Sequence, residues 1–298
     1  MLQTLTSRIL LLLAAALAVE SAAAQLLSLT EVRDGRVEAE LIAEHTALVP
    51  GETARVGLRL KMDEGWHTYW KNSGDAGLAT TIEWELPEGF VAHDIDWPAP
   101  EYYEVGGLAS YGYEGEIVLP VRIEVPADYA GDRVRLRATA DWLVCKEACE
   151  PGTARVSLSL PIVSPEMRQI DQATQPLFAW ADARSVMKRV YEDHGAEAVV
   201  VDDRYVLELA PTHTPVFAKE WVDARFFPED PAAIQMAAAQ KMEISPDRGL
   251  IISMVRNSTS PEPVKRLVGV LAWYNPGALN QTLYYRIDVP VRGGADGG

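Results

Sequence analysis

Cysteine is scarce in this sequence. Only Cys145 and Cys149 occur among 298 residues, which excludes a disulfide-rich scaffold and a zinc site built from four thiolates. The five histidines lie far from the pair in sequence, and the seven methionines form no cluster at ligand spacing. We therefore predict no resident metal or other cofactor.

Long apolar runs are also missing. The longest, Ile9 to Val19, is too short to cross a bilayer, which needs about 20 residues. It follows Arg8 and precedes three consecutive alanines ending at Ala24, which is the layout of a secretory signal peptide. We expect residues 1–24 to be removed and the mature chain to have no membrane span. It should act outside the cytoplasm, where disulfides persist.

Positively charged residues are fewer than negatively charged ones. The chain has 27 Lys and Arg against 43 Asp and Glu, for a net charge of −16, so nucleic acid and anionic lipid should repel it. Phosphate-binding glycine loops and the GxSxG and HExxH motifs are absent, which excludes the enzyme classes that depend on them. A content of 48% hydrophobic and 23% charged residues is typical of a globular protein.

The first half of the sequence has the pattern of β-strands. Apolar and polar residues alternate strictly over residues 55–62, 133–140 and 154–160. This period of two buries one face of each strand and indicates an antiparallel sheet. Turn dipeptides such as Pro50-Gly51 and Pro151-Gly152 separate the runs, as in a β-sandwich. We predict one sandwich domain over residues 25–163.

The second half is also mainly β in pattern. Residues 164–176 are polar and contain prolines, so we predict a linker there. Residues 177–191 can form an amphipathic helix, and residues 232–239 either a short helix or a loop. Strand-like runs then cover residues 205–209, 250–255, 267–273 and 283–291. We predict an all-β protein whose second β-rich domain spans residues 177–292, followed by a disordered tail at 293–298.

The two cysteines lie between two predicted strands, in a segment that ends in the turn dipeptide Pro151-Gly152. We therefore place them at the tip of a hairpin, partly exposed. An aromatic cluster of Trp66, His67, Tyr69 and Trp70 follows another turn. We assign that cluster to the core and rim of the sandwich, with a role in lining the cysteine site as the alternative.

Three roles are open to the cysteine pair. As a staple, a disulfide closing so small a loop contributes only about 2 kcal/mol, and a chain of this length can fold without it. Two thiolates could also hold Cu(I) or half of a zinc site, with His67 or His93 approaching in space. Thiol–disulfide exchange needs only two sulfurs close enough to bond to each other. The sequence favours exchange.

The charges that flank the pair are mostly negative. Asp141, Glu147 and Glu150 surround the cysteines, and Lys146 is the one nearby cation. Negative neighbours raise the pKa of a thiol and keep its thiolate fraction low. Such a site suits a relay that reacts with a docked partner, and it does not suit a strong oxidant.

WLVCKEACEPG at residues 142–152 resembles the active-site hairpin of the amino-terminal periplasmic domain of the DsbD thiol–disulfide interchange family. It looks closest to the ScsB-like branch, which is linked with copper tolerance. Other segments resemble that family in the same order: GWHTYWKNSGDAG at 65–77, IEWELPEGF at 82–90, WPAPE at 97–101 and YGYEGEIVLPV at 111–121. In the second half, FFPEDPAAIQMAAAQ at 226–240 and GLIISM at 249–254 resemble the second β domain of ScsB-like proteins.

This resemblance implies an immunoglobulin-like sandwich with a redox disulfide between Cys145 and Cys149. It implies that Cys149 is the catalytic nucleophile and Cys145 the residue that resolves the mixed disulfide. It also implies a cap loop at about residues 102–113, hinged at Gly106, Gly107 and Gly112, although an ordinary aromatic-rich loop is the alternative. The cap and the site's surround would comprise Tyr102, Tyr103, Tyr111, Tyr113, Glu147 and Glu150.

The function implied is a periplasmic protein that relays reducing equivalents. DsbD spaces its cysteines more widely, and its membrane and thioredoxin domains are missing here. We therefore expect a separate electron donor, either a thioredoxin-like protein or a membrane thiol–disulfide reductase, and periplasmic redox proteins as acceptors. The alternative is a non-catalytic periplasmic binding module that handles copper and carries a structural disulfide.

Overall fold

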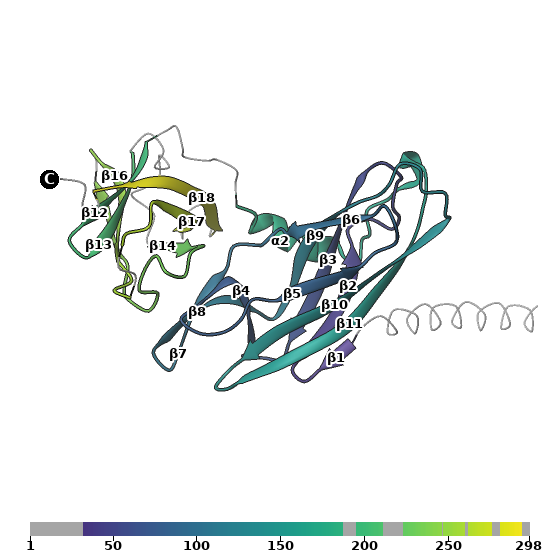
Figure 1. Ribbon diagram of the computed structural model, residues 1–298, viewed down its shortest axis with the longest axis horizontal. Coiled ribbons are helices and arrows are strands. Elements are labelled where there is room, and N and C mark those ends of the chain that lie inside the picture. The colour runs from purple at the N-terminus through teal and green to yellow at the C-terminus, as the bar shows by residue number, and fades with distance from the viewer. Residues whose placement is uncertain are drawn as a thin grey trace, which may run out of the picture.

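The computed structural model describes residues 32–186, 195–210, 223–245, 247–259, 262–275 and 281–293. The predicted signal peptide lies outside these residues, as does the predicted tail beyond Gly293. Two β domains lie next to each other, with a short helix where they meet (Figure 1). Within the described residues, no helix is long and apolar enough to cross a membrane.

The first domain is a sandwich of two antiparallel sheets, as the alternation of apolar residues predicted. The five-stranded sheet has the order β1 (Val32–Asp34), β2 (Val37–Ala43), β3 (Thr53–Met62), β9 (Glu116–Glu124) and β6 (Val91–Ile95). The facing sheet has the order β11 (Cys149–Pro161), β10 (Arg133–Cys145), β4 (His67–Gly74), β8 (Leu108–Glu114) and β7 (Glu101–Val105), and β5 (Thr81–Glu85) also pairs with β10.

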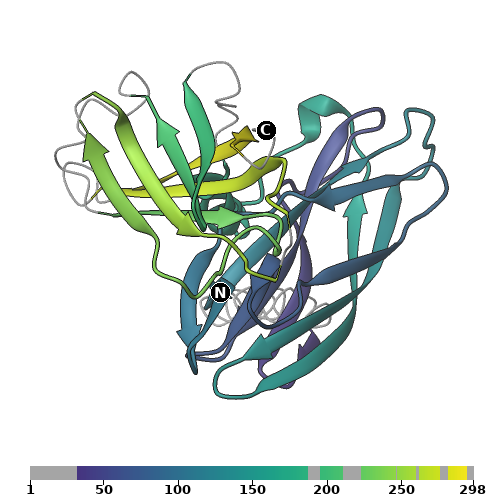
Figure 2. The same cartoon turned by 60° about the vertical axis from the view of Figure 1, so that its left-hand side comes forward.

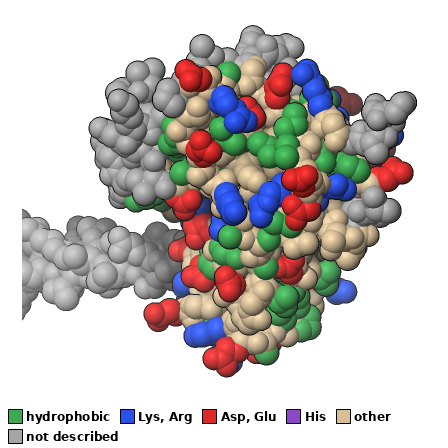
Figure 3. All heavy atoms as spheres, turned by 90° about the vertical axis from the view of Figure 1, so that its left-hand side faces the viewer, with side chains coloured by type: hydrophobic (Ala, Val, Ile, Leu, Met, Phe, Trp, Pro, Cys, Tyr) green, Lys and Arg blue, Asp and Glu red, His purple; other side chains and the backbone are tan. Residues whose placement is uncertain are grey.

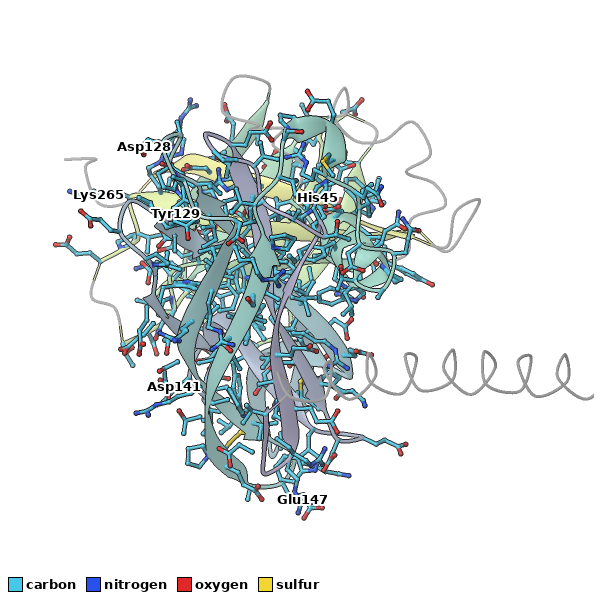
Figure 4. The ribbon with its side chains drawn as sticks, turned by 90° about the vertical axis from the view of Figure 1, so that its right-hand side faces the viewer. His45, Asp128, Tyr129, Asp141, Glu147 and Lys265 are labelled. Atoms are coloured by element: carbon cyan, nitrogen blue, oxygen red, sulfur yellow. A yellow bond between two sulfur atoms is a disulfide. The ribbon has the colours of Figure 1, made fainter. Side chains whose placement is uncertain are left out.

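The hairpin formed by β10 and β11 runs the length of this sandwich. Its register extends without interruption from Arg133 opposite Pro161 to Cys145 opposite Cys149. The tip of the hairpin, marked by Glu147, lies at the opposite end of the domain from Asp128 (Figure 4). Large aromatic side chains fill the core, and Trp70, Tyr111 and Tyr113 are each at most 1% exposed.

The second domain is a seven-stranded mixed sheet. Its order is β14 (Asp223–Pro228), β17 (Arg266–Asn275), β18 (Gln281–Arg292), β12 (Ala196–Val201), β13 (Arg204–Leu209), β16 (Gly249–Val255) and β15 (Lys241–Ser245). β12 and β18 pair in parallel and the other neighbours are antiparallel. Residues 232–239 form turns, not a helix.

The helix that the sequence placed in the second domain packs on the first. It is α2 (Gln175–Ala183), and it buries Phe178 and Ala181 against Ile42 and Val118 on the five-stranded sheet. The apolar outer face that β2 and β9 present there explains this position. The helix ends at Ala183, earlier than predicted, and residues 187–191 of the expected helix lie outside the described residues.

The predicted linker is likewise attached to the first domain. It contains the 3₁₀ helix η1 (Pro165–Met167), and Ile170 forms a β-bridge with His45. The two domains are seen from a second direction in Figure 2. On the face shown in Figure 3, Lys and Arg side chains are mixed with Asp and Glu side chains.

Candidate functional site

Cys145 and Cys149 form a disulfide at the tip of the β10–β11 hairpin. Cys145 is the last residue of β10 and Cys149 the first of β11, so the ladder places them directly opposite each other. The backbone N–H of Lys146 donates to the carbonyl of Ala148 at 3.3 Å and closes the turn between them. The predicted disulfide is therefore present.

The two sulfur-bearing residues differ in exposure. Cys145 is only 4% exposed, because the end of β10 pairs with β11 on one side and with His67 of β4 on the other. Cys149 is exposed because β11 is the edge strand of its sheet. Of the two cysteines, Cys149 is therefore the one that is open to solvent.

Aromatic side chains from two other strands border the disulfide. The phenol oxygen of Tyr69 lies 3.6 Å from the Sγ of Cys149, and the ring of His67 lies 5.3 Å from the ring of Tyr69. Tyr103 of β7 stacks on His67 with a centroid distance of 5.1 Å and an interplanar angle of 12°. These three rings form an aromatic wall beside the sulfurs.

Burial keeps the rings of this wall uncharged. It lowers the pKa of His67 below its ordinary 6.5, so the imidazole is neutral at pH 7. It raises the pKa of Tyr69, although a hydrogen bond with Ser110 opposes the shift. Because a disulfide sulfur carries no proton, only the Tyr69 hydroxyl can donate in its contact with Cys149. The wall thus brings the sulfurs a hydrogen-bond donor and no positive charge.

The charged side chains near the turn are engaged elsewhere or point into solvent. The ammonium of Lys146 donates to the carbonyl of Glu64 at 3.3 Å, and Glu150 lies 3.8 Å from the guanidinium of Arg36. Asp141 and Glu147 are exposed (Figure 4). The two cations at the turn, Lys146 and Arg36, are therefore engaged by oxygen atoms.

The predicted cap loop is a β-hairpin formed by β7 and β8. Gly106 and Gly107 form its turn with φ of +62° and +82°, which suits glycine. A two-residue Gly-Gly connection between two strands is typical of a β-hairpin. Gly112 lies within β8, where an added Cβ would stand 1.9 Å from the carbonyl oxygen of Thr68. It permits close approach of β8 to β4 and is not part of the turn.

The four tyrosines of this hairpin have different surroundings. Tyr103 packs on His67 beside the disulfide. Tyr102 and Tyr111 contact the second domain. Tyr113 is buried in the first domain and donates its hydroxyl to the carbonyl of Pro98 at 2.6 Å. Only Tyr103 is thus in the aromatic wall.

His67 and Tyr69 were assigned from the sequence to the core and rim of the sandwich, with lining of the cysteine site as the alternative, and the structure places both beside the disulfide. They stand two positions apart in β4, so their side chains share one face of the sheet. That spacing is visible in the sequence, but the pairing of β4 with the end of β10 is long-range and has no local pattern. Among the described residues, no group of three or more His, Cys, Asp or Glu side chains could hold a metal ion.

The first domain is similar to a known family. Residues 38–161 match the family model described as "Thiol:disulfide interchange protein DsbD, N-terminal". No curated protein sequence matches the chain.

Solved structures extend the comparison to the fold of both domains. The N-terminal periplasmic domain of ScsB from Proteus mirabilis has a TM-score of 0.60 and 14% identity, over 88% of this chain and 96% of that one. This likeness agrees with the predicted immunoglobulin-like sandwich. A protein of unknown function from Porphyromonas gingivalis W83 has a TM-score of only 0.25 at 9% identity, over 86% of this chain and 100% of that one. It supports no further argument.

Proposed function

Because residues 38–161 match the family model of the N-terminal domain of thiol:disulfide interchange protein DsbD, we propose that the Cys145–Cys149 pair relays reducing equivalents between partner proteins. The observation that carries the proposal is the disulfide itself. It lies at an exposed hairpin tip with one accessible and one buried cysteine, and this difference in access directs an attacking thiolate to one sulfur.

In the proposed reaction, a partner thiolate attacks the Sγ of Cys149. The Cys145–Cys149 bond breaks, and its electron pair leaves with Cys145, which takes up a proton. A second thiol of the partner, as thiolate, then attacks the partner's own sulfur in the mixed disulfide and releases Cys149. The partner ends as a disulfide and this protein as a dithiol, so two electrons have been transferred. Delivery to an acceptor disulfide follows the same steps in reverse.

The aromatic wall has a defined part in this proposal. The Tyr69 hydroxyl is within reach of Cys149 and can donate to the thiolate that forms there, which stabilises it. Tyr103 covers His67 and, with the β7–β8 hairpin, acts as the cap. Glu147 and Glu150 keep the turn acidic, so an unassisted thiol reacts slowly.

A hollow beside the hairpin offers partners an apolar surface. It is lined by Leu78, Ala79, Trp142, Leu143 and Pro151, with Asp34 and Asp141 among its polar residues. Leu78 is 69% exposed, so its apolar side chain is open to a partner that enters this hollow. We propose a thioredoxin-like protein or a membrane thiol–disulfide reductase as donor, and other redox proteins as acceptors.

We propose the periplasm as the compartment. The pattern of residues 1–24 predicts export, and the similar ScsB structure is of a periplasmic domain. An oxidising compartment also allows the disulfide to form.

Exchange with a dithiol protein tests the proposed function. The oxidised protein is mixed with excess reduced thioredoxin at pH 7, quenched with acid and labelled with a maleimide that adds mass. We expect both Cys145 and Cys149 to be labelled, because the accessible sulfur of Cys149 admits the attack. The Cys145→Ser/Cys149→Ser double variant controls for labelling elsewhere. If Cys145 and Cys149 are labelled only after the protein has been denatured and treated with a small reductant, the proposal is rejected.

A further inference from the structure

The second domain contacts the hairpin that borders the redox site. The guanidinium of Arg225 in β14 lies 3.7 Å from the ring centroid of Tyr102. The ring of Phe227, also in β14, meets Tyr111 edge-on at 5.0 Å. β14 therefore provides one side chain to each strand of the β7–β8 hairpin.

Two further contacts lock the same domain onto β4, the strand that carries His67 and Tyr69. The side-chain amide of Asn72 donates to the carbonyl of Pro228 at 2.7 Å in a buried position. The ammonium of Lys71 lies 2.7 Å from a carboxylate oxygen of Glu229. The contact between the domains is thus specific and partly desolvated.

β7 is the strand most dependent on this contact. It is the edge of its sheet and pairs only with β8 among the described strands. An edge strand has ladder hydrogen bonds on one side only and opens more readily than a central strand. Arg225 packs on the face of β7 and helps to hold this strand in place, as a second neighbouring strand would otherwise do.

Adjacent residues of β7 connect the second domain to the disulfide. Successive side chains of a strand point to opposite faces. Tyr102 packs under Arg225, while Tyr103 stacks on His67, whose Cα partner is Cys145. A displacement of β7 away from β14 therefore also moves Tyr103 relative to the disulfide.

We propose that Arg225 and Phe227 are positioning residues for the redox site. By holding the β7–β8 hairpin, they keep Tyr103 packed on His67 and so limit access to the disulfide. This assigns the second domain a role in setting the rate at which the pair reacts. The physiological meaning rests on the proposed relay, but the contact itself can be tested without any protein partner.

The test compares Arg225→Ala with Arg225→Lys in the full chain. Reduction of the disulfide by dithiothreitol at pH 7 should be about two- to tenfold faster in Arg225→Ala, the range that loss of one cation–π contact permits. Arg225→Lys keeps a cation over Tyr102 and should restore a rate near that of the unmodified protein. Arg248→Ala removes an exposed arginine that pairs with Glu208 in the same domain, and should change nothing.

A second readout separates gating from general destabilisation. If the contact controls only access to the disulfide, its loss accelerates reduction and reoxidation by the same factor. The reduction potential of Arg225→Ala should therefore equal that of the unmodified protein. Tyr102→Leu removes the aromatic ring on which Arg225 packs, and it should accelerate reduction by a similar factor. The double variant should be no faster than either single one, because the two residues form one contact.

Several results would overturn the inference. Arg225→Ala reduced at the unmodified rate, Arg225→Lys as fast as Arg225→Ala, or additive effects with Tyr102→Leu would each contradict it. If thioredoxin reduces none of the proteins while dithiothreitol shows the expected differences, the proposed function fails and the positioning role stands.

Discussion

Cys145→Ser is expected to trap a partner as a stable mixed disulfide, and Cys149→Ser is expected to trap none. In the first variant the exposed Cys149 can attack the disulfide of an oxidised partner, but no second thiol remains to release the adduct. In the second variant the remaining thiol is Cys145, which is 4% exposed and out of a partner's reach. Oxidised thioredoxin, non-reducing electrophoresis and mass spectrometry measure the adducts, and we expect at least about a tenfold difference.

The unfolding curves of both variants serve as the control for this experiment. Each should still unfold in one cooperative transition, because Cys149 is exposed and Cys145, which is 4% exposed, is replaced by a side chain of nearly the same size. Equal adduct from both variants, or more from Cys149→Ser, would contradict the assignment of Cys149 as the nucleophile. A Cys149→Ser protein that fails to fold would favour a structural disulfide instead.

Trp70→Ala is expected to have the largest effect on stability. Trp70 is 1% exposed in the core of the sandwich, and removing a buried indole ring costs about 3–5 kcal/mol. Removing the disulfide with the Cys145→Ser/Cys149→Ser double variant should cost at most about 2 kcal/mol, since the closed loop is small. Urea unfolding monitored by circular dichroism measures both changes.

Trp84→Ala provides a matched control, because Trp84 is a half-exposed indole in the same domain. Its loss should cost less than that of Trp70, since less apolar surface leaves a buried environment. If the double cysteine variant lost more stability than Trp70→Ala, the disulfide would be a main support of the fold. The disulfide would then contribute more to stability than the size of its loop predicts.

The strand pattern and the cysteine pair were predictable because both are local. Strict alternation located β3, β10 and β11. The position of the cysteines at a hairpin tip was also predicted, but the turn expected at Pro151-Gly152 is wrong, because both residues pair within β11 and the chain turns at residues 146–148. In the second domain, β14 was not predicted, because its sequence DARFFP has no sustained alternation and ends in proline.

The surroundings of the disulfide were harder to predict because they depend on long-range pairing. His67 faces the cysteines only because β4 pairs with the last residue of β10. Tyr102 and Tyr103 look equivalent in sequence, yet strand geometry directs one to the second domain and the other to the redox site. The position of α2 was also decided by tertiary packing, since its apolar face fits the outer surface of β2 and β9.

The reduction potential of the Cys145–Cys149 pair tests the central claim most directly. It is measured by equilibrating the protein in buffers of defined thiol and disulfide ratio, followed by alkylation and mass spectrometry. A relay should have a potential between about −120 and −270 mV, the range of dithiols that exchange with partners. A value below about −300 mV would identify an inert structural bridge and contradict the account.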